Sequence, residues 1–158
     1  MENKKNRVTN QVSEKFQTRL LSIIEDRDCT KSELASQAKI SYAVMSHMTI
    51  YGIIPTTAIL IKLADYLDLP LAYLLGESDD KTFYKSESPM PFYMRLQQLK
   101  EERQTTYSKI AVVVNFPDSY FHGWIKHKSL PSIEFLRPIA KYFKVTMDYL
   151  VGRTNYKD

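Results

Sequence analysis

The side chains most able to do chemistry in this 158-residue sequence are three histidines, one cysteine and a set of lysines and arginines. His47, His122 and His127 lack the helical spacing with carboxylates that a metal centre uses, and no glycine-rich loop is present to cradle a phosphate. Cys29 is the only cysteine, so no internal disulfide forms, and no histidine is matched to it as an activating base. We therefore expect no enzymatic activity, no cofactor and no metal site.

The basic side chains offer a different chemistry, because they are concentrated in one half of the chain. The whole sequence carries a net charge of +4. Residues 91–158 hold eleven bases against six acids, whereas residues 15–77 hold six bases against seven acids. A basic half is typical of a surface that binds phosphate groups. The alternative, that these are ordinary solvated lysines and arginines, stays open at this point.

Composition limits the class of protein. Charged residues make up 25% of the chain, hydrophobic residues 44%, and there are only four glycines, which indicates a folded and mainly helical protein. Residues 110–114 are among the longest apolar runs, and they are far shorter than the roughly 20 residues that cross a membrane. The start of the chain also lacks the apolar segment of a signal peptide. We expect a cytoplasmic protein with no membrane partner.

A repeat organises the chain. Shifting the sequence by 76 residues aligns residues 16–76 with residues 92–152 without a gap. Identical residues occur along the whole alignment, and in the first copy they include Phe16, Arg19, Leu20, Glu25, Arg27, Thr30, Ser32, Ala35, Pro55, Leu60, Ala64, Tyr66, Tyr73, Leu74 and Gly76. We predict two copies of one domain, residues 9–77 and 91–155. Residues 78–90 form a linker, either a free tether or a segment docked through Phe83 and Tyr84.

Each copy has the signals of five short helices. In the first copy, the second helix opens at Thr30, which forms a capping box with Glu33. The third helix begins at Ser41, a good N-cap, and the fourth follows Pro55. The last helix is brief and ends at Gly76. The sequence therefore predicts an all-α protein with two tandem five-helix domains.

The pattern in each copy resembles the lambda-repressor-like, Cro/Xre-type helix-turn-helix family. The first copy carries the resemblance in RLLSIIEDRDCTKSELASQAKISYAVMSHM and ILIKLADYLDLPLAYLLG, and the second in RLQQLKEERQTTYSKIAVVVNFPDSYFHGWI and LPSIEFLRPIAKYFKVTMDYLVG. The resemblance covers nearly the entire chain. It implies a sequence-specific DNA-binding regulator, by family habit a repressor, whose third helix enters the major groove of double-stranded DNA. The chain departs from the family where a turn glycine is replaced by Lys39 and Asn115.

The resemblance also implies which residues contact DNA. In the second copy they lie at the start of the second helix, along the third helix and in the loop after it: Tyr107, Ser108, Asp118, Ser119, Tyr120, His122, Gly123, Lys126, His127 and Lys128. In the first copy the matching candidates are Lys31, Tyr42, Ala43 and His47. Residues at the helix start and in the loop are expected to contact phosphates, and residues on the third helix are expected to face bases. Asp118 would be repelled by phosphates unless it accepts from a cytosine amino group.

The loop after the third helix of the first copy has no charged residue. Tyr51 and Ile53 are expected to be exposed there, and apolar residues on such a surface indicate a protein contact. We therefore predict that the first copy is an assembly module of a homodimer, in which the two second copies read half-sites about 34 Å apart. Two alternatives stay open. The two copies of one chain could span both grooves, or the protein could be an antirepressor or another regulator that binds a protein effector and has little DNA affinity.

Overall fold

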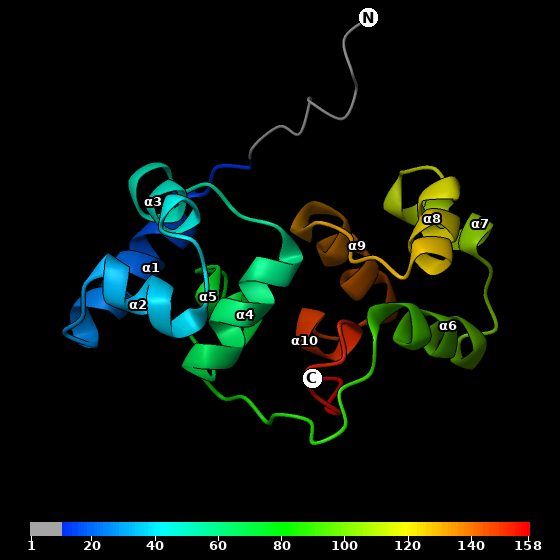
Figure 1. The fold of residues 1–158 in the computed structure, drawn as a ribbon. Helices are drawn as coiled ribbons and strands as arrows, with labels where there is room; N and C mark the ends of the chain where they lie inside the picture. Colours follow the sequence, from blue (N-terminus) through cyan, green and yellow to red (C-terminus); the bar gives the residue numbers. More distant parts are fainter. Residues whose placement is uncertain (1–10) are drawn as a thin grey trace, which may run out of the picture. The chain divides into compact units, whose positions relative to one another are not determined.

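The computed structural model describes residues 11–158, and within that range the chain forms ten α-helices and one isolated antiparallel bridge between Val12 and Ile53 (Figure 1). The predicted all-α class is confirmed. None of the helices in residues 11–158 is long and apolar enough to cross a membrane. The chain divides into two compact units, with the boundary after Lys81. Residues 9 and 10 of the first predicted domain lie outside the described range.

The first unit contains five helices, and α3 packs against both α1 and α2. Their bounds are α1 Glu14–Asp26, α2 Lys31–Ala38, α3 Tyr42–Tyr51, α4 Thr57–Leu67 and α5 Leu71–Leu74. Each helix turns an apolar face inward, and the side chains with no exposed surface include Phe16, Leu20, Leu34, Met45, Met48, Leu60, Leu63, Leu71 and Leu74. The core of this unit therefore has one aromatic ring among aliphatic and methionine side chains.

The second unit has its own five helices. Their bounds are α6 Phe92–Glu102, α7 Tyr107–Val114, α8 Ser119–His127, α9 Ile133–Phe143 and α10 Met147–Leu150. Helices α7, α9 and α10 begin and end 76 residues after α2, α4 and α5, which is the shift that aligns the two halves of the sequence. Side chains buried without exposure include Leu96, Leu99, Ile110, Phe121, Leu136, Ile139, Phe143 and Leu150.

Local hydrogen bonds explain where α2 and α3 begin and end. The backbone N–H of Glu33 donates to the Thr30 hydroxyl at 3.1 Å, and the Thr30 N–H donates back to the Glu33 carboxylate at 3.4 Å, so the predicted capping box is present. The Ser41 hydroxyl accepts from the N–H of Val44 at 3.2 Å, which confirms Ser41 as the N-cap of α3. Between these two helices the chain reverses at Lys39, whose φ of 60° is left-handed.

The segment predicted as a linker is divided between the two units and packed on each. In the first unit, the Arg19 guanidinium donates to the carboxylate of Asp79 at 2.9 Å, and the Lys81 ammonium lies 5.5 Å from the ring centre of Tyr73. In the second unit, the guanidinium carbon of Arg153 lies 4.2 Å from the ring centre of Phe83. Phe83 is therefore docked on the second unit, whereas Tyr84, whose ring centre lies 5.1 Å from that of Tyr156, is 61% exposed.

Candidate nucleic-acid interface

The corner between α7 and α8 is built on a buried phenylalanine. Phe121 has no exposed surface, and its ring lies 5.4 Å from that of Phe116 and 5.3 Å from that of Trp124. The turn before α8 passes through Asn115, whose φ of 63° is left-handed and is better tolerated by asparagine than by most residues. Phe121 therefore points inward. Trp124 is only half-buried, because its ring closes the edge of the cluster.

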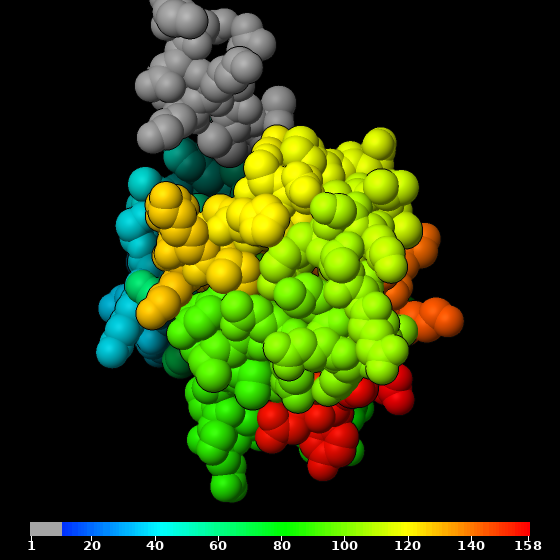
Figure 2. All heavy atoms as spheres, turned by 90° about the vertical axis from the view of Figure 1, so that its right-hand side faces the viewer, coloured from blue at the N-terminus to red at the C-terminus, as the bar shows by residue number. Residues whose placement is uncertain are grey.

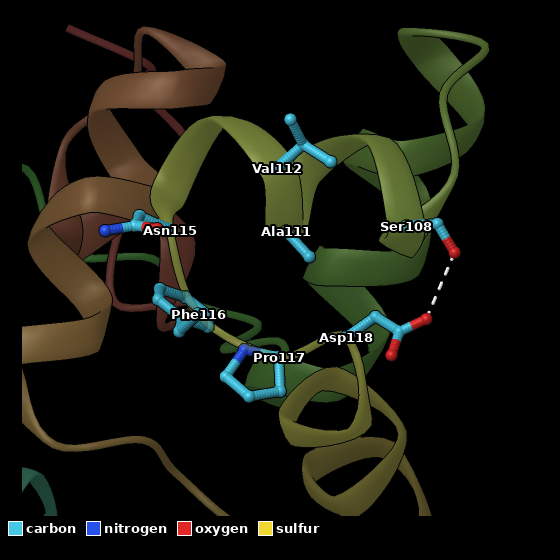
Figure 3. Close-up of a pocket in the computed structure, with 7 residues that line it drawn as sticks. All are labelled: Ser108, Ala111, Val112, Asn115, Phe116, Pro117 and Asp118. Carbon is cyan, nitrogen blue, oxygen red and sulfur yellow. Dashed lines mark hydrogen bonds between the residues drawn. The ribbon is translucent and has the colours of Figure 1, made fainter.

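Asp118 joins the two helices of this corner. Its carboxylate accepts a hydrogen bond from the hydroxyl of Ser108 on α7, at 3.1 Å, and makes no capping bond to the start of α8 (Figure 3). The first turn of α8 is held by backbone bonds instead, including Tyr120 N–H to the Pro117 carbonyl at 3.1 Å. Ser108 therefore fixes the direction of a half-buried carboxylate at the N-terminal end of α8.

An open groove of about 580 Å³ lies beside this carboxylate, in the bend between α7 and α8 (Figure 3). It is lined by Ser108, Ala111, Val112, Asn115, Phe116, Pro117 and Asp118. Val112 is 82% exposed and the neighbouring Val113 67% exposed. Sequence reasoning missed this apolar surface. The signal was the run of residues 110–114, since a helix that buries Ile110 and Ala111 leaves Val112 and Val113 on the outside.

A polar and basic stripe follows the outer face of α8. Ser119, His122 and Lys126 are all exposed, and their spacing of three and four residues places them on one side of the helix. His127 is exposed in the last turn, and Figure 2 shows the α8 segment in yellow at the surface. Lys128 is also exposed, with its ammonium 5.5 Å from the ring centre of Tyr93. The four basic candidates are thus accessible, and three of them gather at the C-terminal end of α8.

Tyr120 belongs to the packing of the corner as well as to its surface. It is 42% exposed, and its ring is stacked at 5.9 Å on Phe116 and meets Phe135 edge-on at 5.4 Å. The expectation that Tyr120 lies on the outer face is met by part of its ring. A substitution there would disturb the aromatic packing, so it makes a poor probe of a base contact.

Tyr107 departs from its expected place. Its ring is stacked on Phe121 at 5.5 Å, and its hydroxyl is buried without a hydrogen-bond partner in the described part of the chain. Burial, and to a lesser degree the negative charge of Glu101, raises the pKa of this hydroxyl above its usual value. The structure contradicts the expectation that Tyr107 contacts a phosphate, because a buried hydroxyl has no open side to offer one.

Gly123 lies in the middle of α8, and no packing requires it. A β-carbon added at this position meets no atom within 4 Å. Glycine inside a helix costs about 0.5–1 kcal/mol relative to alanine, because it loses more conformational freedom on folding. The absence of a side chain here leaves the backbone of α8 open to close approach from outside.

The corresponding corner of the first unit has a different surface. Tyr42, Ala43 and His47, the predicted base-facing residues of this copy, are exposed on α3, and Lys31 is half-buried at the start of α2. The α3 segment and its flanks, residues 40–61, contain no aspartate, glutamate, lysine or arginine. The nearest lysines in sequence are Lys39 and Lys62, so residues 40–61 themselves offer phosphates no lysine or arginine.

Tyr51 is exposed, as expected, but the exposure expected of Ile53 is wrong. Tyr51 is 59% exposed. Ile53 is half-buried, because the chain just before α1 pairs with its loop: Val12 bridges Ile53, and the N–H of Ile54 donates to the Gln11 carbonyl at 2.8 Å. Ile53 lines an open groove of about 230 Å³ beside α3 and is partly covered by its own chain.

Comparisons with known proteins add no family or function to this geometry. No protein-family model, curated protein or solved structure matches the chain. Within residues 11–158, no three histidine, cysteine, aspartate or glutamate side chains come together in a way that could hold a metal ion. The two helix corners, and above all the outer face of α8, are therefore the features that bear on function.

Proposed function

We propose that this chain is a sequence-specific DNA-binding transcriptional regulator with two tandem lambda-repressor-like helix-turn-helix domains, and that it acts as a repressor. In this proposal α8 of the second unit lies in the major groove, which is wide enough to admit an α-helix. The observation that carries the proposal is the exposed stripe of Ser119, His122 and Lys126 along α8.

The charges of the second unit supply the phosphate contacts. Lys126, His127 and Lys128 are exposed at the end of α8, and residues 91–158 carry five more bases than acids. Cations placed there neutralise backbone phosphates and release counterions, which gives affinity without sequence preference. They also set the register of the helix on the duplex, because phosphate contacts position a protein and base contacts specify the sequence.

Base recognition falls to the first half of α8. Ser119 and His122 offer donors and acceptors to base edges, and Asp118 offers an acceptor to the amino group of cytosine. The hydrogen bond from Ser108 holds that carboxylate in place before any ligand arrives. Gly123 lets the helix backbone approach the groove floor closely, which gives a reason for a glycine that no internal contact requires.

The experiment is selection of bound duplexes from a random DNA pool by the full chain, followed by sizing of the purified complex. We expect one consensus sequence to emerge, with a cytosine or guanine at the position nearest Asp118. Failure to enrich any sequence, at an ionic strength low enough to favour phosphate contacts, would contradict the proposal.

A second candidate function is a protein-interaction module that keeps this fold and binds DNA only weakly. The observation that favours it is the uncharged surface of the first unit, residues 40–61. A mobility-shift assay with random-sequence duplex at low salt separates the two functions. A DNA-binding regulator retards the duplex through its lysines, whereas a chain that lost DNA affinity leaves the duplex free.

A further inference from the structure

The groove between α7 and α8 of the second unit combines an apolar wall with one carboxylate (Figure 3). Its volume is about 580 Å³, and its wall includes Ala111 and Val112 of α7 and the turn residues Phe116 and Pro117. Among the described residues that line it, Asp118 alone carries a charge. The groove therefore offers a partner apolar contacts and a single negative charge.

The fold does not require the exposed valines beside this groove. Val112 is 82% exposed and Val113 67% exposed. The residues 76 positions earlier are Ser36 and Gln37, both exposed on α2, which is a helix of eight residues like α7. Valine favours a helix no more than serine does, and less than glutamine. Apolar side chains that neither the core nor the helix needs are typical of a surface that contacts another protein.

The carboxylate of the groove is also specific to the second unit. Asp118 replaces Tyr42 of the first unit, and although it is the N-cap residue of α8 it makes no capping bond. A carboxylate has about four acceptor sites, and the hydrogen bond from Ser108 uses one of them. An arginine guanidinium can donate two parallel N–H bonds to such a carboxylate. Arginine is therefore the cation that best complements this half-buried group.

The shape and the charge of the second unit limit what can occupy the groove. A small molecule needs most of its surface enclosed, whereas this groove is open along one side and suits an extended protein segment. Two copies of the second unit would repel one another, because residues 91–158 carry five more bases than acids. For the same reason, the segment should carry few cations besides the one that meets Asp118.

We propose that this groove binds a segment of another protein that presents one arginine to Asp118 and apolar side chains to Val112, and that the bound segment keeps α8 away from DNA. The first step depends on the groove alone. The second step rests on the proposed function, in which Asp118 accepts from a cytosine amino group. A carboxylate held by an arginine cannot meet a base at the same time, so the partner releases the chain from its DNA site.

The test begins with selection of displayed random peptides by the full chain, followed by fluorescence-anisotropy titration of the enriched peptide without DNA. We expect the enriched peptides to share one arginine flanked by apolar residues. Val112→Ser with Val113→Gln installs the residues of the first unit, and Asp118→Asn removes the charge but keeps an acceptor for Ser108. Each variant should raise the dissociation constant of the peptide at least about ten-fold. Met94→Ser, which removes a 44%-exposed apolar side chain from α6, should leave it unchanged.

A change in the peptide identifies the contact itself. Replacing the peptide's arginine by glutamine should weaken binding to the wild-type chain and should not weaken binding to Asp118→Asn further, because that pair is already broken. Thermal unfolding checks that each variant is folded. In the second step, the unaltered peptide should displace a duplex that the chain has selected from random DNA.

Four results would overturn the proposal. The first is that no enriched peptide depends on Val112 and Val113, and the second is an equal loss for the glutamine peptide with wild type and with Asp118→Asn. The third is self-association of the chain that Val112→Ser with Val113→Gln abolishes, which would assign the groove to a second copy. The fourth, a bound peptide that leaves the duplex in place, would overturn the second step. The peptide titrations contain no DNA, so failure of the proposed DNA binding would not alter them.

Discussion

The corner of α2 and α3 and the corner of α7 and α8 have the same backbone plan and different surfaces. Both turns pass through a left-handed residue, Lys39 or Asn115, at the end of an eight-residue helix. Residues 40–61, which include α3, contain no aspartate, glutamate, lysine or arginine, whereas α8 ends in Lys126 and His127. Caps and core side chains fix a helix pair, and they leave its outer face free to take on another chemistry.

The C-terminal ends of α3 and α8 are also held in different ways. In the first unit, the Gln17 side-chain amide donates to the backbone carbonyls of Thr49 and Ile50, at 3.0 and 2.9 Å, and ties the end of α3 to α1. The matching residue of the second unit is Tyr93, whose ring lies under the Lys128 ammonium. The last turn of α8 is therefore stabilised by its own cations, which favour a helix C-terminus, and its surface stays positive.

The largest expected effect comes from removing the ring on which α8 is built. Phe121→Ala deletes a side chain with no exposed surface and should lower the free energy of unfolding of the second unit by about 3–5 kcal/mol. Because the two units have separate cores, the first unit should keep its protection. Hydrogen exchange under mild denaturant, resolved by peptide, measures both. Equal loss of protection in α1–α5 and α6–α10 would contradict the independence of the units.

Two exposed histidines, one in each unit, test whether only the second unit recognises DNA. His122 lies on α8 and His47 on α3, and both are exposed. His122→Ala should weaken binding of the selected DNA by about 1–3 kcal/mol and relax the preference at one base position. His47→Ala should change neither. The measurement is fluorescence-anisotropy titration of the selected duplex and of duplexes altered at single positions. Equal losses for both variants would assign DNA reading to both units.

Gly123→Ala separates stability from binding. Since nothing within 4 Å obstructs a new methyl group, the second unit should gain about 0.5–1 kcal/mol in the free energy of unfolding. The same methyl group should weaken DNA binding if the duplex approaches the backbone there. Denaturant unfolding and DNA titration of the one variant give both numbers. A variant that is more stable and binds DNA as tightly as wild type would remove the proposed reason for this glycine.

The smallest expected effect is at Tyr107, where the hydroxyl lacks a partner. Tyr107→Phe should change the free energy of unfolding at neutral pH by less than about 1 kcal/mol and leave DNA affinity unaltered, because the buried hydroxyl contacts no phosphate. Folding raises the pKa of this group above 10.0, so its share of stability is complete below pH 10.0 and is lost as the pH rises through the folded pKa. The phenylalanine variant should lack that alkaline loss. A ten-fold drop in the DNA affinity of Tyr107→Phe would contradict this prediction and indicate that the Tyr107 hydroxyl contacts a phosphate.

The repeat and the caps were enough to predict the fold class and the start of several helices. Thr30 and Ser41 each accept from the backbone N–H three residues further on, and such short-range bonds can be predicted from sequence. The exposure of Ser119, His122 and Lys126 followed from the resemblance and agrees with the structure.

Contacts between distant residues were not predictable. The exposure expected of Ile53 is wrong because nothing in its loop shows that Val12, some forty residues earlier, lies against it. The phosphate contact expected of Tyr107 comes from the resemblance, which places it at the start of the second helix, while the direction of its ring depends on Phe121. The hydrogen bond between Ser108 and Asp118 crosses a turn, and only the structure shows that it replaces a capping bond.

The most direct measurement of DNA binding by the second unit is the salt dependence of affinity for a charge-matched pair of variants. Lys126→Gln with Lys128→Gln changes the end of α8, and Lys141→Gln with Lys144→Gln makes the same change at the end of α9, where Lys144 is also a left-handed C-cap. We predict that the α8 variant binds DNA more weakly and that its plot of log affinity against log salt is flatter by about 1.8, or 0.9 for each lost phosphate contact. The α9 variant should keep the wild-type slope. Equal slopes for all three proteins, or no binding by wild type at low salt, would contradict a DNA-reading role for α8.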